Sequence, residues 1–192
     1  MTNLANYRQE ELTLHAGKTE LLGLFYPLPF VAIIVLMYYL VWGESSFISP
    51  YIYFKSFFGN MSSIILLAVI IVGIIVHEFI HGFTWAQFAT EGLKSMKYGV
   101  IWKYLTPYCH CKEPLLVKHY ITGGIMPAII LGFIPSIIAI IIGGYGLLLF
   151  GIFFTFAAGG DFIIVSMLLK QPASNLVQDH PTKVGCYVHR DV

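Results

Sequence analysis

Residues 64–81 read Ile-Ile-Leu-Leu-Ala-Val-Ile-Ile-Val-Gly-Ile-Ile-Val-His-Glu-Phe-Ile-His, an apolar run that ends in a cluster of ionisable side chains. In a helix, His77 and His81 lie one turn apart on one face, with Glu78 beside them. This is the HExxH pattern, in which two imidazoles bind zinc and the carboxylate takes a proton from water. Ionisable groups are costly inside a membrane helix, so they point to a functional site. The alternative interpretation is that the three side chains only satisfy one another's hydrogen bonds between helices.

The composition is that of a polytopic membrane protein. Of the 192 residues, 57% are hydrophobic and 11% are charged, and the mean hydropathy is +0.77. The net charge of +1 lacks the basic character of nucleic-acid-binding proteins, so we expect no nucleic-acid partner. Residues 1–20 are too polar for a signal peptide, and the first apolar segment is therefore expected to remain as a membrane helix. The three cysteines, an odd number without framework spacing, do not indicate a disulfide scaffold.

Several apolar segments are long enough to cross a bilayer, which takes about 20 helical residues. These segments cover about 21–42, 62–90, 119–142 and 147–169. We therefore predict an all-α membrane protein with about four transmembrane helices in one polytopic domain, residues 1–192. Segment 96–108 is rich in aromatic and β-branched residues, which predicts a small interfacial β-hairpin between the second and third helices. The aromatic segment 43–61 is also expected to lie in the membrane interface.

The positive residues predict the orientation of the spans. Of the 11 Lys and Arg residues, only Lys55 lies outside the N-terminal segment, the 91–118 segment and the C-terminal tail. An even number of spans places these three segments on one side of the membrane. By the positive-inside rule that side is the cytoplasm, so both termini are predicted to be cytoplasmic.

Asp161 is the other ionisable residue that lies well inside a predicted span. His77 and Asp161 each lie about 15 residues, or roughly 22 Å, beyond the outer end of their helices, so their depths in the bilayer should match. The small residues 157–160 would let the two helices approach closely. A catalytic zinc site needs three protein ligands and an open position, and Asp161 is the predicted third ligand. The alternative is that Asp161 only hydrogen-bonds a ligand histidine.

Other donors fit the pattern less well. The position of the third histidine in metzincins is occupied by Gln87, and Glu91 could serve only if the chain folded back. His119, at the start of the third span, is a candidate for contact with substrate or transition state; the alternative is an interfacial histidine without a special role.

A second metal site on the cytoplasmic side is a further hypothesis. Its donors would be Cys109, His110, Cys111, His180 and Cys186. The spacing of the first two cysteines is not that of usual zinc sites, and reduced structural thiols are the ordinary state of cysteines in the cytoplasm.

A membrane HExxH helix with an aspartate on another span resembles the site-2 protease group of intramembrane metalloproteases. The chain from residue 62 onward also resembles a bacterial membrane family labelled putative zincin peptidase. The stretches that carry this resemblance are 77–81, 107–114, 126–127, 159–161 and 179–181. The resemblance implies zinc ligation by His77, His81 and Asp161, with Glu78 as general base. One departure is that the sequence Ala-Gly-Gly-Asp ending at Asp161 lacks the asparagine with which site-2 proteases hold substrate, so no oxyanion stabiliser is assigned.

We therefore expect an integral, multi-pass zinc metalloprotease in a bacterial cytoplasmic membrane. Its partners would be the lipid bilayer and a membrane-protein or peptide substrate, cleaved near the cytoplasmic leaflet. The alternatives are a membrane zinc hydrolase that acts on a lipid or small amide, and a non-catalytic zinc-binding membrane protein.

Overall fold

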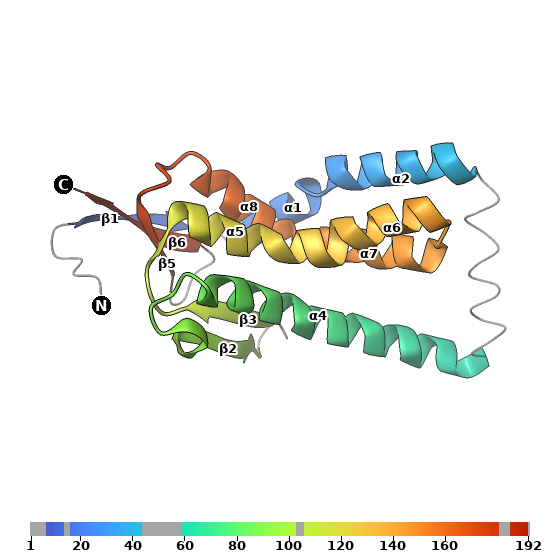
Figure 1. Cartoon of the computed structure of the whole chain (residues 1–192), viewed down its shortest axis with the longest axis horizontal. Coiled ribbons are helices and arrows are strands. Elements are labelled where there is room, and N and C mark those ends of the chain that lie inside the picture. The colour runs from blue at the N-terminus through green and yellow to red at the C-terminus, as the bar shows by residue number, and fades with distance from the viewer. Residues whose placement is uncertain (1–6, 14–15, 44–58, 103–105, 181–184, 192) are drawn as a thin grey trace.

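The computed structural model describes residues 7–13, 16–43, 59–102, 106–180 and 185–191. Most of the predicted interfacial segment 43–61 lies outside the described residues, as does Pro181. Figure 1 shows helices running along the long axis of the molecule, with the strands gathered at one end.

Within the described residues, the helices provide three candidate membrane spans, or four if a bent pair counts as one. The first span, Leu21–Trp42, joins the end of α1 (Ala16–Phe25) to α2 (Leu28–Trp42). The second is α4 (Ser62–Ala86), which ends four residues before the predicted limit of this span. The third, Val117–Ile142, combines α5 (Val117–Pro127), the π-helix η5 (Ala128–Phe133) and α6 (Ile134–Ile142). The bent pair is α7 (Tyr145–Ala157) and α8 (Gly159–Leu168), whose axes differ by 48°.

Proline and glycine mark the irregular points of these helices. Pro127 has no N–H group to donate within its helix, and the π-helical turn follows it directly. Gly143 ends α6 in the left-handed region at φ 74°, where its N–H group donates to the carbonyl of Ala139 at 2.9 Å. The carbonyl of Gly143 accepts a hydrogen bond from the Tyr38 hydroxyl at 3.0 Å, which ties α2 to this turn.

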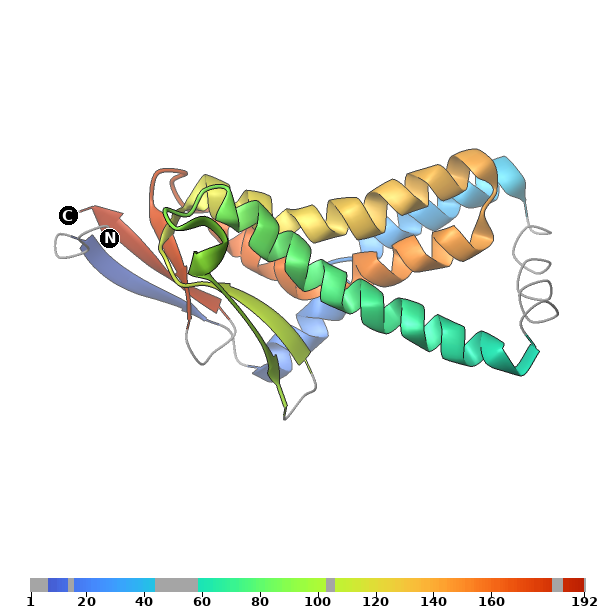
Figure 2. The ribbon, with the colours of Figure 1, turned by 60° about the horizontal axis from the view of Figure 1, so that its bottom comes forward.

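Helix α4 is packed along only part of its length. Its C-terminal half lies against α5 and β3, whereas no residue between Ser62 and Val72 is buried. Gly73 is the first buried residue, and its missing side chain allows the Phe154 ring of α7 to approach. Figures 1 and 2 show α4 diverging from α6 and α7 toward its N-terminal end.

The expectation of an all-α protein needs correction, because two small antiparallel sheets adjoin the helices. A four-stranded sheet has the order β1-β6-β5-β4. Its strands are β1 (Tyr7–Thr13), β6 (Gly185–Asp191), β5 (Leu176–Asp179) and β4 (Leu115–Leu116). This sheet was not predicted, because it forms between segments from opposite ends of the described chain. Tyr7 pairs with Asp191, and Thr13 with Gly185.

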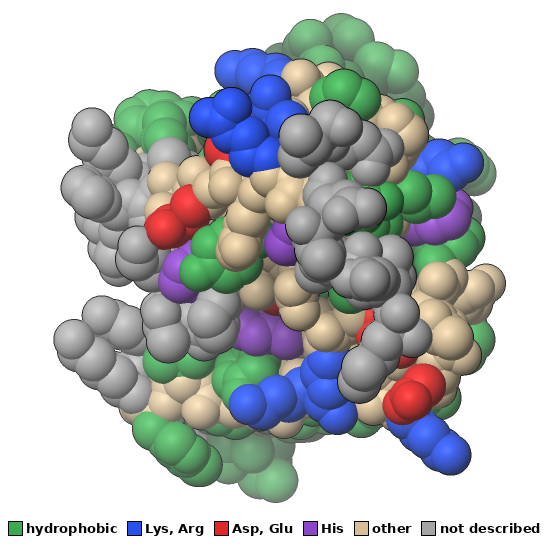
Figure 3. All heavy atoms as spheres, turned by 90° about the vertical axis from the view of Figure 1, so that its left-hand side faces the viewer, with side chains coloured by type: hydrophobic (Ala, Val, Ile, Leu, Met, Phe, Trp, Pro, Cys, Tyr) green, Lys and Arg blue, Asp and Glu red, His purple; other side chains and the backbone are tan. Residues whose placement is uncertain are grey.

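The predicted hairpin is present as β2 (Met96–Ile101) and β3 (Thr106–Cys111), preceded by the 3-10 turn η4 (Gly92–Ser95). Buried Trp85, Tyr120, Leu168 and Val188 belong to one core cluster, which joins the sheet and the hairpin to the ends of the helices. Figure 3 looks onto this end of the molecule and shows Lys and Arg side chains around its margin.

Candidate metal centre

Helices α4 and α8 bring His77, His81 and Asp161 together. The Nε2 atom of His77 lies 3.1 Å from Oδ2 of Asp161, and Nε2 of His81 lies 3.3 Å from Oδ1. The two Nε2 atoms are 3.2 Å apart. One ligand atom from each residue lies within 4.8 Å of the others, and both histidines are buried.

The orientation of His81 is fixed by α5. Its Nδ1 atom lies 2.9 Å from the carbonyl oxygen of Gly123, which can only accept a hydrogen bond, so Nδ1 carries the proton. In the neutral ring, Nε2 therefore presents a lone pair to His77 and Asp161. The His81 ring stacks on Trp85, with centroids 5.0 Å apart and planes inclined by 16°.

Two imidazole nitrogens and a carboxylate that converge on one point suit a divalent cation. Without a cation, a neutral His77 offers a single proton at Nε2. Two acceptors compete for this proton: the lone pair on Nε2 of His81 and the oxygens of Asp161. A metal ion accepts electron density from all three at once, and nitrogen and carboxylate donors are typical of zinc. The Gly123 carbonyl supplies the outer hydrogen bond that metal-binding histidines commonly make. The residues present therefore fit a zinc ion.

Glu78 lies apart from this hydrogen-bonded trio. Its carboxylate accepts a hydrogen bond from the backbone N–H of Cys109 on β3. On the helix, Glu78 is about 100° from His77, so it flanks the donors instead of joining them. The alternative interpretation was that Glu78 and the two histidines only satisfy one another's hydrogen bonds. It does not fit this arrangement, because the histidines contact Asp161 and Glu78 contacts β3.

The edge of β3 faces α4. Because β3 pairs with β2 on its other side, the N–H groups of alternate residues point away from the hairpin. The N–H of Cys109 reaches Glu78, and that of Cys111 donates to Oδ2 of Asp179 at 2.8 Å. Pro107, the other residue of this register, has no N–H group.

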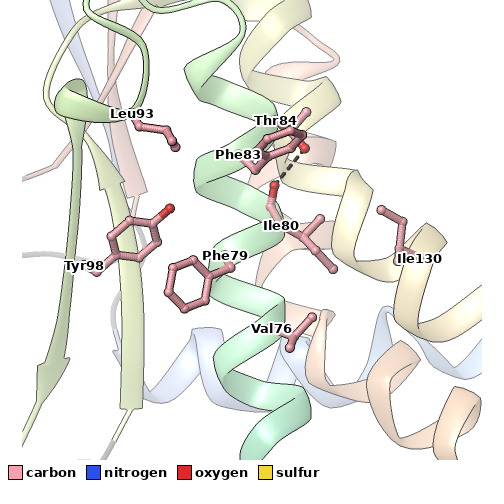
Figure 4. Close-up of a pocket in the computed structure, with 8 residues that line it drawn as sticks. All are labelled: Val76, Phe79, Ile80, Phe83, Thr84, Leu93, Tyr98 and Ile130. Atoms are coloured by element: carbon pink, nitrogen blue, oxygen red, sulfur yellow. Dashed lines mark hydrogen bonds between the residues drawn. The ribbon is translucent and has the colours of Figure 1, made fainter.

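An apolar hollow of about 450 Å³ lies on another face of α4 (Figure 4). Its walls are Val76, Phe79, Ile80, Phe83, Thr84, Leu93, Tyr98 and Ile130. The Thr84 hydroxyl donates to the carbonyl of Ile80 at 2.7 Å, so it offers little polarity to the hollow. None of the three candidate metal donors lines it.

His119 is not brought to the cluster. Its ring stacks on Phe88, with centroids 4.1 Å apart, and Phe88 lies seven residues beyond His81, or about 10 Å further at the helical rise. A contact between His119 and substrate stays a prediction that this geometry does not favour.

The hypothesis of a second metal site finds no support in the part of the chain that the structure describes, where His77, His81 and Asp161 form the one group of three donors close enough to share an ion. The cysteines of that hypothesis are free and buried. Burial raises the pKa of the Cys109 and Cys186 thiols to about 12 and that of Cys111 to about 11. In the described residues these thiols are therefore buried and protonated at neutral pH, as expected of reduced structural cysteines.

Sequence reasoning missed the residues that support the cluster. Trp85 donates its indole N–H to the Tyr120 carbonyl at 3.0 Å and separates the His81 and Tyr120 rings. Gly123 has no room for a side chain, because a Cβ atom there would overlap the Trp85 ring. The pair Gly123-Gly124 was the available signal, since small residues in a membrane helix indicate close packing.

A sequence profile of the family described as "Putative zincin peptidase" matches residues 70–176, more than half of the chain. The chain belongs to this family. The match includes His77, Glu78, His81 and Asp161 and ends before β6. No curated protein and no solved structure is significantly similar to the chain.

Proposed function

We propose that this protein is a membrane-embedded zinc metallopeptidase that hydrolyses peptide bonds of membrane-protein substrates near the cytoplasmic leaflet. In this proposal His77, His81 and Asp161 hold the zinc ion, and Glu78 is the general base. The main support for this proposal is that three metal donors from two candidate membrane helices lie close together, with Glu78 beside them. Membership of the putative zincin peptidase family supports the same chemistry.

A bound zinc ion would supply Lewis acidity, which lowers the pKa of water and polarises a carbonyl group. The protein's own contribution is positional. The Gly123 carbonyl fixes the tautomer of His81, and the Cys109 N–H group orients the Glu78 carboxylate. Glu78 would take a proton from the attacking water and deliver it to the leaving nitrogen of the peptide.

We also propose that both termini lie in the cytoplasm and that α7 and α8 together form a fourth span. Strands β1 and β6 pair along their full described length, so both strands lie on one side of the helices (Figure 1). An even number of crossings is required for that pairing. Figure 3 shows Lys and Arg side chains at this end, which supports its cytoplasmic location. Lys94 of η4, Lys112 after β3 and Lys118 at the start of α5 are exposed.

The decisive experiment is the metal content of the detergent-purified protein. About one zinc ion per chain is expected in the wild type, as for a mononuclear site, with loss of zinc in His77→Ala and Asp161→Ala. His119→Ala is the matched control, because this histidine lies outside the cluster and should leave zinc unchanged. A folded wild type that binds no zinc overturns the proposal. Full zinc affinity in Asp161→Ala would reduce Asp161 to a hydrogen-bonding partner of a ligand histidine.

Glu78→Gln separates a hydrolase from a protein that only binds zinc. This variant should retain zinc, because Glu78 is outside the donor trio, and lose hydrolysis. Membrane proteins of cells expressing wild type and Glu78→Gln can be compared for fragments that depend on an intact Glu78. Fragments that accumulate equally in both would contradict the proposed general base. Glu78-dependent changes confined to lipids would favour the lipid-hydrolase alternative.

A further inference from the structure

We propose that Asp179 is a positioning residue. It fixes the supports of the metal ligand His81 and of the general base Glu78, and thereby the position of each side chain relative to the other. This inference rests on the proposed function and adds a residue of the C-terminal segment to it. Asp179 is the last residue of β5 and lies beyond residue 176, where the family match ends. Its carboxylate has two hydrogen-bond partners, and each leads to one side of the candidate site.

The first partner leads to the metal ligands. The Tyr120 hydroxyl donates to Oδ1 of Asp179. The Tyr120 ring stacks on Trp85 with centroids 4.9 Å apart, and Trp85 in turn stacks on His81 at 5.0 Å. The three rings thus form a continuous stack in the order His81, Trp85, Tyr120. His81, the candidate ligand, is at one end, and Tyr120, at the other end, is hydrogen-bonded to Asp179.

The second partner leads to the base. Oδ2 of Asp179 accepts the Cys111 N–H at 2.8 Å, and the next N–H group on the same edge of β3, that of Cys109, binds Glu78. A shift of β3 along or away from α4 would therefore move the hydrogen-bond donor of Glu78. Asp179 fixes β3 at the adjacent position of this edge.

Both hydrogen bonds converge on the one Asp179 carboxylate, which therefore contacts α5 and the hairpin at the same time. Asp179 pairs with Cys186 of β6, so it is supported by the sheet that contains the two terminal strands. Through Asp179, this sheet contacts both α5 and the hairpin. The two carboxyl oxygens can accept both hydrogen bonds at once, one at Oδ1 and one at Oδ2. An uncharged, non-accepting side chain would release both connections together.

The test uses the full-length protein in detergent with four variants. Asp179→Ala removes both connections, Asp179→Asn keeps an acceptor for one of them, and Tyr120→Phe removes only the phenol hydroxyl. Gln178→Ala is the matched control: Gln178 also ties β5 to the hairpin, through the Lys112 carbonyl at 3.0 Å, but it reaches neither Tyr120 nor Cys111. Zinc affinity is measured by chelator competition. The visible spectrum at saturating Co²⁺ reports the coordination geometry, and thermal unfolding reports stability.

Asp179→Ala is expected to weaken zinc binding by about 10-fold, the lower end of the effect of outer partners, because two rings separate it from His81. Its Co²⁺ spectrum should differ from that of the wild type. Hydrogen exchange of β3 should be faster in Asp179→Ala than in Tyr120→Phe. Asp179→Asn should recover part of the affinity, and Gln178→Ala should retain wild-type affinity and spectrum.

Two failures are distinguishable. A wild type without zinc overturns the proposed function and this inference with it. A wild type that binds zinc, with Asp179→Ala lowering only the unfolding temperature while affinity and spectrum are unchanged, overturns the positioning role and leaves the proposed function standing. If Asp179→Ala does not fold, Asp179→Asn and Tyr120→Phe decide: wild-type affinity and spectra in both overturn the inference, and shifted spectra support it.

Discussion

Replacing Gly123 with alanine tests the packing that orients His81. A Cβ atom at Gly123 would overlap the Cδ1 and Nε1 atoms of the Trp85 ring, so the ring has to move. That ring stacks on His81, and its N–H group donates to the Tyr120 carbonyl. One added methyl group therefore disturbs both the core and the support of a candidate metal ligand.

The neighbouring Gly124 provides a matched control. Its Cβ atom would meet only the Cγ2 methyl of Val165, at 3.2 Å, and that side chain can adjust. Both substitutions gain the same helix propensity, up to about 1 kcal/mol, so the gain cancels in the comparison. Overpacking costs about 1–3 kcal/mol, and loss of the Trp85 hydrogen bond costs about 1 kcal/mol more. Gly123→Ala should thus be about 2–4 kcal/mol less stable than Gly124→Ala.

The assay is thermal unfolding of the two variants in one detergent, followed by zinc titration. At about 2–4 °C per kcal/mol for a chain of this size, the melting temperatures should differ by roughly 5–15 °C. Gly123→Ala should also bind zinc more weakly than Gly124→Ala, because displacement of Trp85 removes the surface on which His81 rests. Equal melting temperatures and equal zinc affinities in the two variants would refute the proposed role of this packing.

Further expectations concern other parts of the chain. Gly159→Ala should destabilise the protein by about 1–3 kcal/mol, because its Cβ would overlap the Gly23 carbonyl of α1. Gly160→Ala is the control, since its Cβ meets nothing within 4 Å. Equal unfolding temperatures of the two variants would contradict the close α1–α8 contact. Hydrogen bonds from Ser95 and Thr90 hold the pKa of Glu113 at about 2, below the ordinary 4.5, so its stabilisation is complete above pH 4.5 and lost toward pH 2. Glu113→Gln should flatten the dependence of unfolding temperature on pH in that range, and an unchanged slope would count against it. The buried cysteine thiols, with pKa values of about 11 or 12, should react with a thiol reagent near pH 8 only on unfolding; fast reaction of the native protein would disprove their burial.

Local chemistry was readable from the sequence where a helix fixes the geometry. The i, i+4 spacing puts His77 and His81 on one face of any helix, whatever packs against it. The predicted meeting with Asp161 depended on a further argument, that equal distances from the same membrane face give equal depth. The structure places Asp161 within 3.3 Å of both histidines. The same reasoning could not place His119, because depth alone does not say which face of α5 turns toward α4.

The apolar spans, the HExxH face and the β2–β3 hairpin could be predicted from the amino-acid sequence alone, because hydropathy and helical or strand periodicity are local properties. Three features became visible only in the folded chain: the pairing of β1 with β6, the support of Glu78 by the Cys109 N–H group, and the connection from Asp179 to both sides of the candidate site. These contacts use backbone groups, which are the same in nearly every residue, or side chains far apart in the chain. No local pattern encodes them, since they exist only once the helices and the terminal strands have packed together.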